Sequence, residues 1–161
     1  MAEQTETVAG GCTCGHVRYE MAGPPLVVHG CHCRWCQRQS GSAFAINALI
    51  EEDRVTLTHG EVHEIMVATP SGAGQRISRC PKCQVAVWSN YLRAGSNVRF
   101  VKVGTLDDPD RHPPDVHIYT EDKQPWVTLP AGVPAVAKFY VVEEVYSADS
   151  LKRRAALQAR A

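Results

Sequence analysis

The sequence contains the stretch Cys31-His32-Cys33-Arg34-Trp35-Cys36, in which three thiols fall within six residues. A Cys-x-Cys step followed by a Cys-x-x-Cys step can bring three sulfurs onto one soft divalent metal such as zinc. Three protein ligands leave the fourth corner of a zinc tetrahedron to water or to an incoming group, as in catalytic zinc sites. The same three residues taken alone are equally compatible with reduced buried thiols, or with a disulfide and one spare thiol.

The other four cysteines form two pairs, and their spacing strengthens the metal interpretation. The pairs are Cys12 with Cys14 and Cys80 with Cys83. Together they have the composition of a closed four-thiolate zinc site, so we expect two Zn²⁺ ions per chain. Spacing alone does not force this division, because Cys31 and Cys33 could equally partner Cys80 and Cys83. The contiguity of the triplet favours a quartet and a separate trio.

Length and composition are those of an ordinary globular protein. The chain has 161 residues, of which 44% are hydrophobic and 21% charged, which suits one domain with its own core. It has no long apolar run, and residues 1–6 lack the basic and apolar parts of a signal peptide, so we expect a cytoplasmic protein. Clustered cysteines in a reducing compartment are more often metal ligands than disulfides. A formal net charge of zero predicts no nucleic-acid partner, and nothing predicts a membrane partner or an oligomeric state.

Short alternating segments predict a mainly β fold of coiled antiparallel sheets held together by metal. We expect a loose N-terminus over 1–9, a single zinc-binding β domain over 10–145 and a C-terminal helical tail over 146–161. Polar residues from Arg34 to Ser40, followed by Gly41, predict a short helix after the cysteine triplet. Asp149 or Ser150 is expected to cap a second helix that runs through Ala159. The expected strands are 17–21, 26–29, 44–50, 54–58, 62–67, 76–79, 85–88, 98–103 and 136–145, while 107–135 is expected to be largely irregular.

Several motifs together resemble the glutathione-dependent formaldehyde-activating enzyme family, which also includes centromere-protein-V-like proteins. Residues 10–20, Gly-Gly-Cys-Thr-Cys-Gly-His-Val-Arg-Tyr-Glu, resemble the opening of that family. Residues 31–38 with Ser-Gly-Ser-Ala-Phe at 40–44 resemble its central motif, and Cys-Pro-Lys-Cys at 80–83 resembles its second knuckle. Residues 104–109 and 117–126 resemble later signatures, so the resemblance covers about 10–130.

The resemblance implies a zinc-stabilised β fold shared in outline with small Rab-accessory proteins. It implies a structural zinc on the quartet and a catalytic zinc on the triplet. The reaction of the family's named member is condensation of formaldehyde with glutathione to S-hydroxymethylglutathione. Gln84 departs from the family pattern, because a glycine usually follows the second knuckle, and we expect a wider turn there. The tail after about Tyr140, with Lys152, Arg153 and Arg154, matches nothing in the family pattern.

The ligand set favours a carbon–sulfur lyase that forms or cleaves adducts between a small thiol and an electrophile such as formaldehyde. Three thiolates make zinc a poor Lewis acid, but its open corner can hold a substrate thiolate and lower the pKa of that thiol. Glutathione also presents carboxylates, so Arg34 and Arg38 are candidate substrate-binding residues, with Trp35 as a candidate pocket wall. Two solvated arginines and a core tryptophan are the alternative interpretation.

Other interpretations remain open at the level of sequence. The protein could be a non-catalytic zinc module that binds a protein partner, or a family member that acts on another thiol. His16, His29, His32 and His117 are candidate proton donors or fourth ligands, although a lone histidine is more often simply hydrogen-bonded. Tyr119 and Trp126 could line a substrate pocket or belong to the core.

Overall fold

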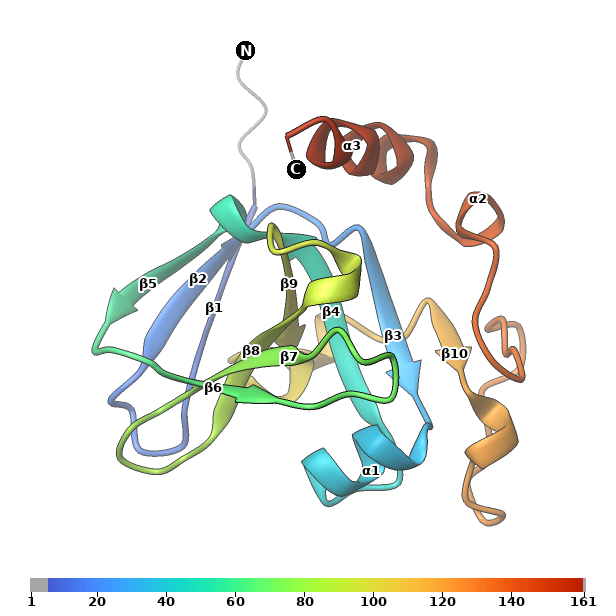
Figure 1. Cartoon of the computed structure of the whole chain (residues 1–161), viewed down its shortest axis with the longest axis horizontal. Coiled ribbons are helices and arrows are strands. Elements are labelled where there is room, and N and C mark those ends of the chain that lie inside the picture. Colours follow the sequence, from blue (N-terminus) through green and yellow to red (C-terminus); the bar gives the residue numbers. More distant parts are fainter. Residues whose placement is uncertain (1–5, 161) are drawn as a thin grey trace.

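The computed structural model describes residues 6–160, which form two β-sheets with helices at the ends of the larger one (Figure 1). The smaller sheet has the strand order β1-β2-β5, with β1 (Thr7–Gly11), β2 (Arg18–Ala22) and β5 (Val55–His59). The larger sheet has seven strands, in the order β10 (Val116–Ile118), β3 (Val27–Cys31), β4 (Ala45–Glu51), β9 (Val98–Lys102), β8 (Ala86–Tyr91), β7 (Gln75–Arg79) and β6 (His63–Val67). The helices are α1 (Arg34–Ser40), α2 (Val142–Val145) and α3 (Ala148–Gln158).

The predicted mainly β, antiparallel class is confirmed, with one parallel pair. All strand pairs within the two sheets are antiparallel except β10 with β3. The sequence predicts a largely irregular segment over 107–135, but Val116–Ile118 within it adds a strand to the edge of β3. A three-residue strand carries too little periodicity to be recognised from sequence.

The larger sheet is covered on both faces, and this determines where the metal ligands lie. One face packs against the smaller sheet around Tyr19 and Trp88, whose rings meet edge to face at 5.4 Å. The other face lies under α1 and the C-terminal segment. The buried cluster on this side includes Cys31 and Phe100 of the sheet and Cys36 of α1. All five residues of β3 are buried, as expected for a central strand covered on both sides.

The N-terminal region differs from the expected loose segment over 1–9. Residues 7–9 begin β1 and pair with Ala22, Met21 and Glu20 of β2. The side chain of Val8 enters the core with 8% of its surface exposed, and this burial offsets the low strand propensity of the neighbouring glycines. Residues 1–5 of the expected segment lie outside the described part of the chain.

The C-terminal region contains the predicted helix, but not the strand expected over 136–145. Residues near Val136 follow the edge of β10 through isolated hydrogen bonds, such as Val136 N–H to the His117 carbonyl at 2.9 Å. Because β10 is only three residues long, it offers too short an edge for a continuous ladder. The short helix α2 follows. The cap of α3 is Ser147 and not the expected Asp149 or Ser150, because the Ser147 hydroxyl accepts a hydrogen bond from the Ser150 N–H and so starts the helix earlier.

Helices α1 and α3 lie at opposite ends of the larger sheet (Figure 1). The predicted span of α1 is confirmed, and Gly41 ends it in a left-handed conformation, with φ of 65°. Among residues 6–160, no helix combines the length and the apolar composition needed to cross a membrane.

Candidate metal centres

Two cysteine knuckles that are far apart in the sequence form the first candidate metal centre. Cys12 and Cys14 lie in the turn between β1 and β2, and Cys80 and Cys83 lie in the turn between β7 and β8. The Sγ atom of Cys14 lies 3.6 Å from that of Cys12 and 3.7 Å from that of Cys80. All four sulfurs are within 4.8 Å of one another. A zinc tetrahedron with Zn–S bonds of about 2.3 Å has edges of about 3.8 Å, so the quartet fits zinc.

The backbone of the two knuckles follows the same pattern. The N–H of Cys12 donates to the carbonyl of Val17 at 3.0 Å, and the N–H of Cys80 donates to the carbonyl of Val85 at 3.0 Å. Each of these bonds closes a loop of the same length around a ligand pair. The four sulfurs of the two knuckles form one group and the three sulfurs of the triplet form another, so Cys31 and Cys33 do not lie in the group that contains Cys80 and Cys83.

Gln84 does not widen the second knuckle, contrary to our expectation. It adopts φ of 62°, close to the 74° of Gly15 in the first knuckle. Its N–H donates to the Cys80 carbonyl at 3.0 Å, which keeps the turn closed. Its side-chain amide donates to the Pro81 carbonyl at 2.9 Å, a local bond that offsets part of the cost of a left-handed non-glycine residue.

Backbone N–H groups stabilise the negative charge on several of these sulfurs. The N–H of Val17 donates to the Sγ of Cys12 at 3.2 Å. The N–H of Val85 is the largest contribution that lowers the pKa of Cys83, to about 6. Such bonds favour the thiolate, which is the form that binds metal.

The triplet forms the second candidate metal centre, where β3 leads into α1. Cys31 ends β3, Cys33 is the residue that caps α1, and Cys36 lies in the first turn of that helix. The sulfurs of Cys31 and Cys33 are 3.5 Å apart, too far for a disulfide of about 2 Å, and all three sulfurs lie within 4.8 Å of one another. The N–H of Cys36 donates to the Sγ of Cys33 at 3.3 Å. The triplet therefore also has the composition and the spacing of a zinc site.

Hydrogen bonds among the three thiols shift their pKa values in opposite directions. Hydrogen bonds from Cys31 and Cys36 lower the pKa of Cys33 to about 2. The hydrogen bond to Cys33 and burial raise the pKa of Cys31. Three close sulfurs cannot all ionise without a cation, and a divalent metal would allow all three to be thiolates.

The four candidate histidines do not complete the triplet. Within residues 6–160, no further His, Asp or Glu ligand atom joins the three sulfurs in a group spanning 4.8 Å. His32 instead meets His117 at 3.0 Å, and His29 meets the Tyr140 hydroxyl. Burial lowers the pKa of both His29 and His32 to about 4. The hydrogen-bonded alternative therefore describes His29, His32 and His117 better than metal ligation, while the ring of His16 lies edge to face with that of His59.

Three other side chains flank the triplet. Burial and the negative potential of Cys36, Cys31 and Cys33 raise the pKa of Tyr91, and burial and the same sulfurs raise that of Tyr119. Burial lowers the pKa of Lys102, while the sulfurs oppose this effect.

Lys102 and Tyr91 are absent from the sequence-based candidates. A signal for Lys102 was present, because alternation places it on the same face of its strand as the apolar residues Val98 and Phe100.

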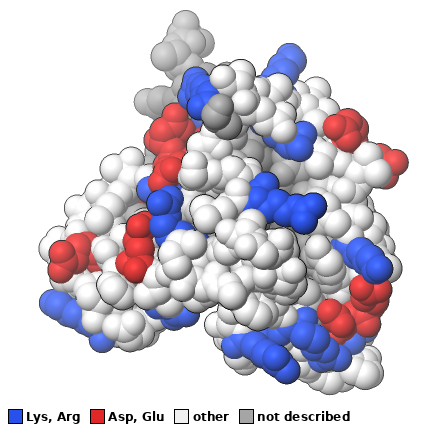
Figure 2. Space-filling model, viewed as in Figure 1, with Lys and Arg blue, Asp and Glu red and all other residues white. Residues whose placement is uncertain are grey.

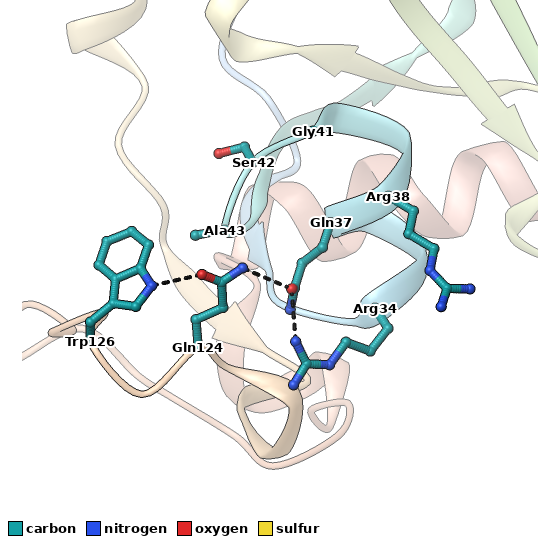
Figure 3. A pocket seen from close by; sticks show the side chains of 8 residues that line it. All are labelled: Arg34, Gln37, Arg38, Gly41, Ser42, Ala43, Gln124 and Trp126. Atoms are coloured by element: carbon teal, nitrogen blue, oxygen red, sulfur yellow. Dashed lines mark hydrogen bonds between the residues drawn. The ribbon is translucent and has the colours of Figure 1, made fainter.

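Arg34 and Arg38 line an open pocket of about 550 Å³ on the outer side of α1 (Figure 3). Gln37, Gln124 and Trp126 line it as well, and no cysteine does. The guanidinium of Arg34 donates to the Gln37 side-chain oxygen at 3.0 Å, whereas Arg38 points away from this group and has no hydrogen-bond or ion-pair partner within 6–160 (Figure 3). Trp35, the candidate pocket wall, does not line this pocket.

A chain of hydrogen bonds connects this pocket with the metal-binding loop. The Trp126 N–H donates to the Gln124 side-chain oxygen at 2.7 Å, and the Gln124 amide donates to the Gln37 side-chain oxygen at 3.2 Å (Figure 3). The amide of Gln37 in turn donates to the backbone carbonyl of His32 at 2.6 Å. Trp126, with 73% of its surface exposed, is thereby held in one orientation.

The charge distribution is mixed on the face seen in Figure 2. Basic and acidic side chains are interspersed there, and basic groups are most frequent at the end where α1 lies (Figure 2). This view shows no extended surface of one sign.

Comparisons with known proteins agree with the motifs of the sequence. Residues 7–122 match the family described as "Glutathione-dependent formaldehyde-activating enzyme". A Halomonas elongata protein named "Putative glutathione-dependent formaldehyde-activating enzyme" is 27% identical over 125 residues, which cover 74% of this chain and 79% of that protein. A crystal structure of a Rhodobacter sphaeroides protein is similar with a TM-score of 0.48 and 20% identity, over 62% of this chain and 87% of that one.

The family match spans both cysteine knuckles and the triplet, and it covers more than half of the chain. The chain therefore belongs to the glutathione-dependent formaldehyde-activating enzyme family.

Proposed function

We propose that this protein is a zinc-dependent carbon–sulfur lyase that forms or cleaves adducts between a small thiol, such as glutathione, and formaldehyde or a related small electrophile. The observation that carries the proposal is the triplet, in which three sulfurs lie within 4.8 Å of one another without a fourth protein ligand in the described chain. A purely structural zinc site is normally closed by four protein ligands, as the quartet is.

Cys31, Cys33 and Cys36 would hold the catalytic zinc. When bound there, zinc would keep the substrate sulfur as a thiolate close to neutral pH. In the reaction with formaldehyde, the sulfur forms a bond to carbon, the carbonyl π bond breaks, and the thiol proton ends on the new hydroxyl oxygen. The reverse sequence cleaves the adduct.

The residues around the triplet support this chemistry. The hydroxyls of Tyr91 and Tyr119 are protonated at neutral pH, as tyrosines ordinarily are, and can donate a hydrogen bond to a developing alkoxide. The backbone N–H of Cys36 holds the Cys33 sulfur in place at 3.3 Å. These groups belong to β8, α1 and the segment after β10, so the fold brings them together from distant parts of the chain.

Arg34 and Arg38 are the candidates for binding the carboxylates of a glutathione-like thiol. They lie on the outer face of α1, whereas Cys36 lies on its buried face. The bond from Gln37 to the His32 carbonyl ties the pocket wall to the loop between Cys31 and Cys33. Our proposal is that a substrate several bonds long places its carboxylates in this pocket and its sulfur at the triplet.

The quartet would have a structural role. It joins the turn between β1 and β2 to the turn between β7 and β8, and so links the two sheets. Metal binding of this kind contributes directly to the free energy of folding.

Calorimetry with glutathione and its S-methyl derivative tests the proposal on the zinc-loaded protein. Glutathione should bind with release of a proton, and its affinity should rise as the pH approaches the thiol pKa of about 8.5. The S-methyl compound should bind at least about tenfold more weakly, because a thioether cannot supply an anionic ligand. Equal affinity for both compounds would show that the sulfur does not bind the metal.

Cobalt substitution and turnover separate the enzyme from a zinc module that only binds a protein partner. In the cobalt-loaded protein, a thiol at the open corner should produce an additional sulfur-to-metal charge-transfer band, and formaldehyde should then yield the hydroxymethyl adduct. Thiol coordination without any product from formaldehyde would argue for another electrophile, and the absence of both would favour the binding module.

A further inference from the structure

Lys102 lies on the same face of the larger sheet as the cysteine triplet. It ends β9 and pairs with Asn47 of β4, while Ala45, two residues before Asn47, pairs with Cys31 of β3. Since side chains at alternate positions of a strand share a face, Lys102 extends toward the region occupied by the triplet. Val98 and Phe100, the other residues of β9 on this face, are buried with 8% and 9% exposure.

The ammonium group of Lys102 has a hydrogen-bond acceptor but no carboxylate. Its Nζ donates to the side-chain oxygen of Asn47 at 2.8 Å, and Asn47 itself is only 4% exposed. Within residues 6–160, no Asp or Glu forms an ion pair with Lys102. A partly buried charge is normally balanced by an opposite one, and among residues 6–160 the acidic groups beside Lys102 on this face of the sheet are the thiols of the triplet.

The other charged and titratable groups around Lys102 do not provide this balance. Arg79 on β7 is positive and disfavours the charged lysine. Tyr91 on β8 and Tyr119 after β10 are neutral hydroxyls that face the same sulfurs. The sulfurs come from two elements, β3 for Cys31 and α1 with its cap for the other two.

We propose that Lys102 is the specificity-determining residue that makes the Cys31–Cys33–Cys36 site accept an anionic fourth ligand, a thiolate, in preference to a neutral one. The inference rests on the proposed function for its substrate class. A divalent ion with three thiolates already has a negative formal charge, so a fourth anion is repelled. The ammonium of Lys102 offsets this repulsion in a partly buried region, where water screens charges less effectively.

The test uses the full chain loaded with cobalt and titrated with three probes. Mercaptoethanol and azide are anionic when bound, and imidazole is a neutral ligand of similar size. Lys102→Met removes the charge but keeps the length of the side chain, Lys102→Gln keeps a hydrogen-bond donor for Asn47, and Lys102→Arg keeps the charge. Lys152→Met, an exposed residue of α3, is the matched control.

The expected result is a loss of affinity that depends on ligand charge. Lys102→Met and Lys102→Gln should weaken azide and mercaptoethanol by about tenfold or more at neutral pH, and leave imidazole unchanged or tighter. The pH at which the thiol is half-bound should rise by about one unit in these variants. Lys102→Arg and Lys152→Met should behave as the wild type does.

Several outcomes would overturn the inference. Equal weakening of imidazole and the two anions would indicate a structural role, and unchanged anion binding would show that the charge of Lys102 is irrelevant. If both uncharged variants, Lys102→Met and Lys102→Gln, failed to retain the cobalt ion of the triplet, the role of Lys102 would be metal retention and not ligand selection. If the wild type binds azide but no thiol, the proposed function fails, while the effect of Lys102 on azide still decides this inference.

Discussion

Arg153 of α3 forms a two-point ion pair with Glu51, the last residue of β4. The Arg153 Nε donates to one carboxylate oxygen at 2.7 Å, and its Nη2 donates to the other at 2.6 Å. The side chains of Arg153 and Glu51 are 12% and 8% exposed. This contact gives a role to one of the tail residues that matched nothing in the family pattern, because it attaches the C-terminal helix to the sheet.

Arg153→Ala should lower the free energy of unfolding by about 1–3 kcal/mol, because the nearly buried Glu51 carboxylate loses its two-point partner and keeps only the more exposed Arg54, whose Nε lies 3.5 Å from Glu51 Oε1. Chemical denaturation at neutral pH measures this difference. Lys152→Ala, on the exposed side of the same helix, should change stability by less than about 0.5 kcal/mol. Equal effects of the two substitutions would contradict the role of the ion pair.

The contribution of Glu51 should also depend on pH. Burial raises the pKa of this carboxyl, but the hydrogen bonds and charge of Arg153 outweigh that effect, so its pKa in the folded protein is lowered. The stabilisation is therefore present above the unfolded-state pKa of about 4.3 and is lost as the pH falls through the lower folded-state value. The melting temperatures of the wild type and Arg153→Ala should converge as the pH falls below the unfolded-state value and through the folded-state value, and a constant difference across this range would count against the linkage.

The zinc-replete protein should contain about two zinc ions per chain, of unequal lability. The quartet offers four sulfurs and the triplet only three, so a chelator should remove the triplet zinc first. Metal analysis during a stepwise chelator titration measures both the number of ions and the order of loss. One tightly held ion with no second site would contradict the proposed catalytic centre.

Cys80→Ser and Cys33→Ser should have different consequences. Cys80 is fully buried in the knuckle that joins the two sheets, so its loss should unfold the domain or lower the melting temperature by more than about 10 °C. Cys33→Ser should leave a folded protein without activity, because it removes a ligand of the triplet alone. Thermal melts with zinc present would show equal damage if the triplet were structural too.

Gln84→Val should destabilise the second knuckle by about 1–2 kcal/mol, because a β-branched residue tolerates φ of 62° poorly and cannot replace the bond to Pro81. Gln84→Gly is the matched variant, since glycine adopts this conformation freely, and it should stay within about 0.5 kcal/mol of the wild type. Denaturation of the zinc-loaded protein measures both values. A glycine variant as unstable as the valine variant would show that the side-chain bond, and not the backbone conformation, decides stability here.

Arg38→Ala should weaken glutathione by about fivefold and leave mercaptoethanol unaffected, because only glutathione carries carboxylates. Arg38 has no other partner in the described chain, so its removal should not disturb the fold. Calorimetry with both thiols provides the comparison within one variant. The same change in affinity for the two thiols would place the carboxylates elsewhere.

Local features of this protein are determined by its sequence alone. The cysteine triplet, the two separate cysteine pairs, the short helix after the triplet and most strands follow from spacing, capping and alternation over a few neighbouring residues. Gly41 is an example, since its left-handed conformation ends α1 where the sequence predicts. Such features depend on the conformational preferences of adjacent residues, which sequence patterns record directly.

Only the tertiary structure decides which distant residues meet. It places Lys102 and Tyr91 beside the triplet, pairs the three-residue β10 with β3, and joins Arg153 to Glu51 across the length of the chain. It also places the pocket lined by Arg34 apart from the cysteines. The spacing of these residues in the sequence did not show whether they share one pocket. These contacts are selected by packing and burial over the whole domain, and no local pattern specifies the partner of a lysine or a short edge strand.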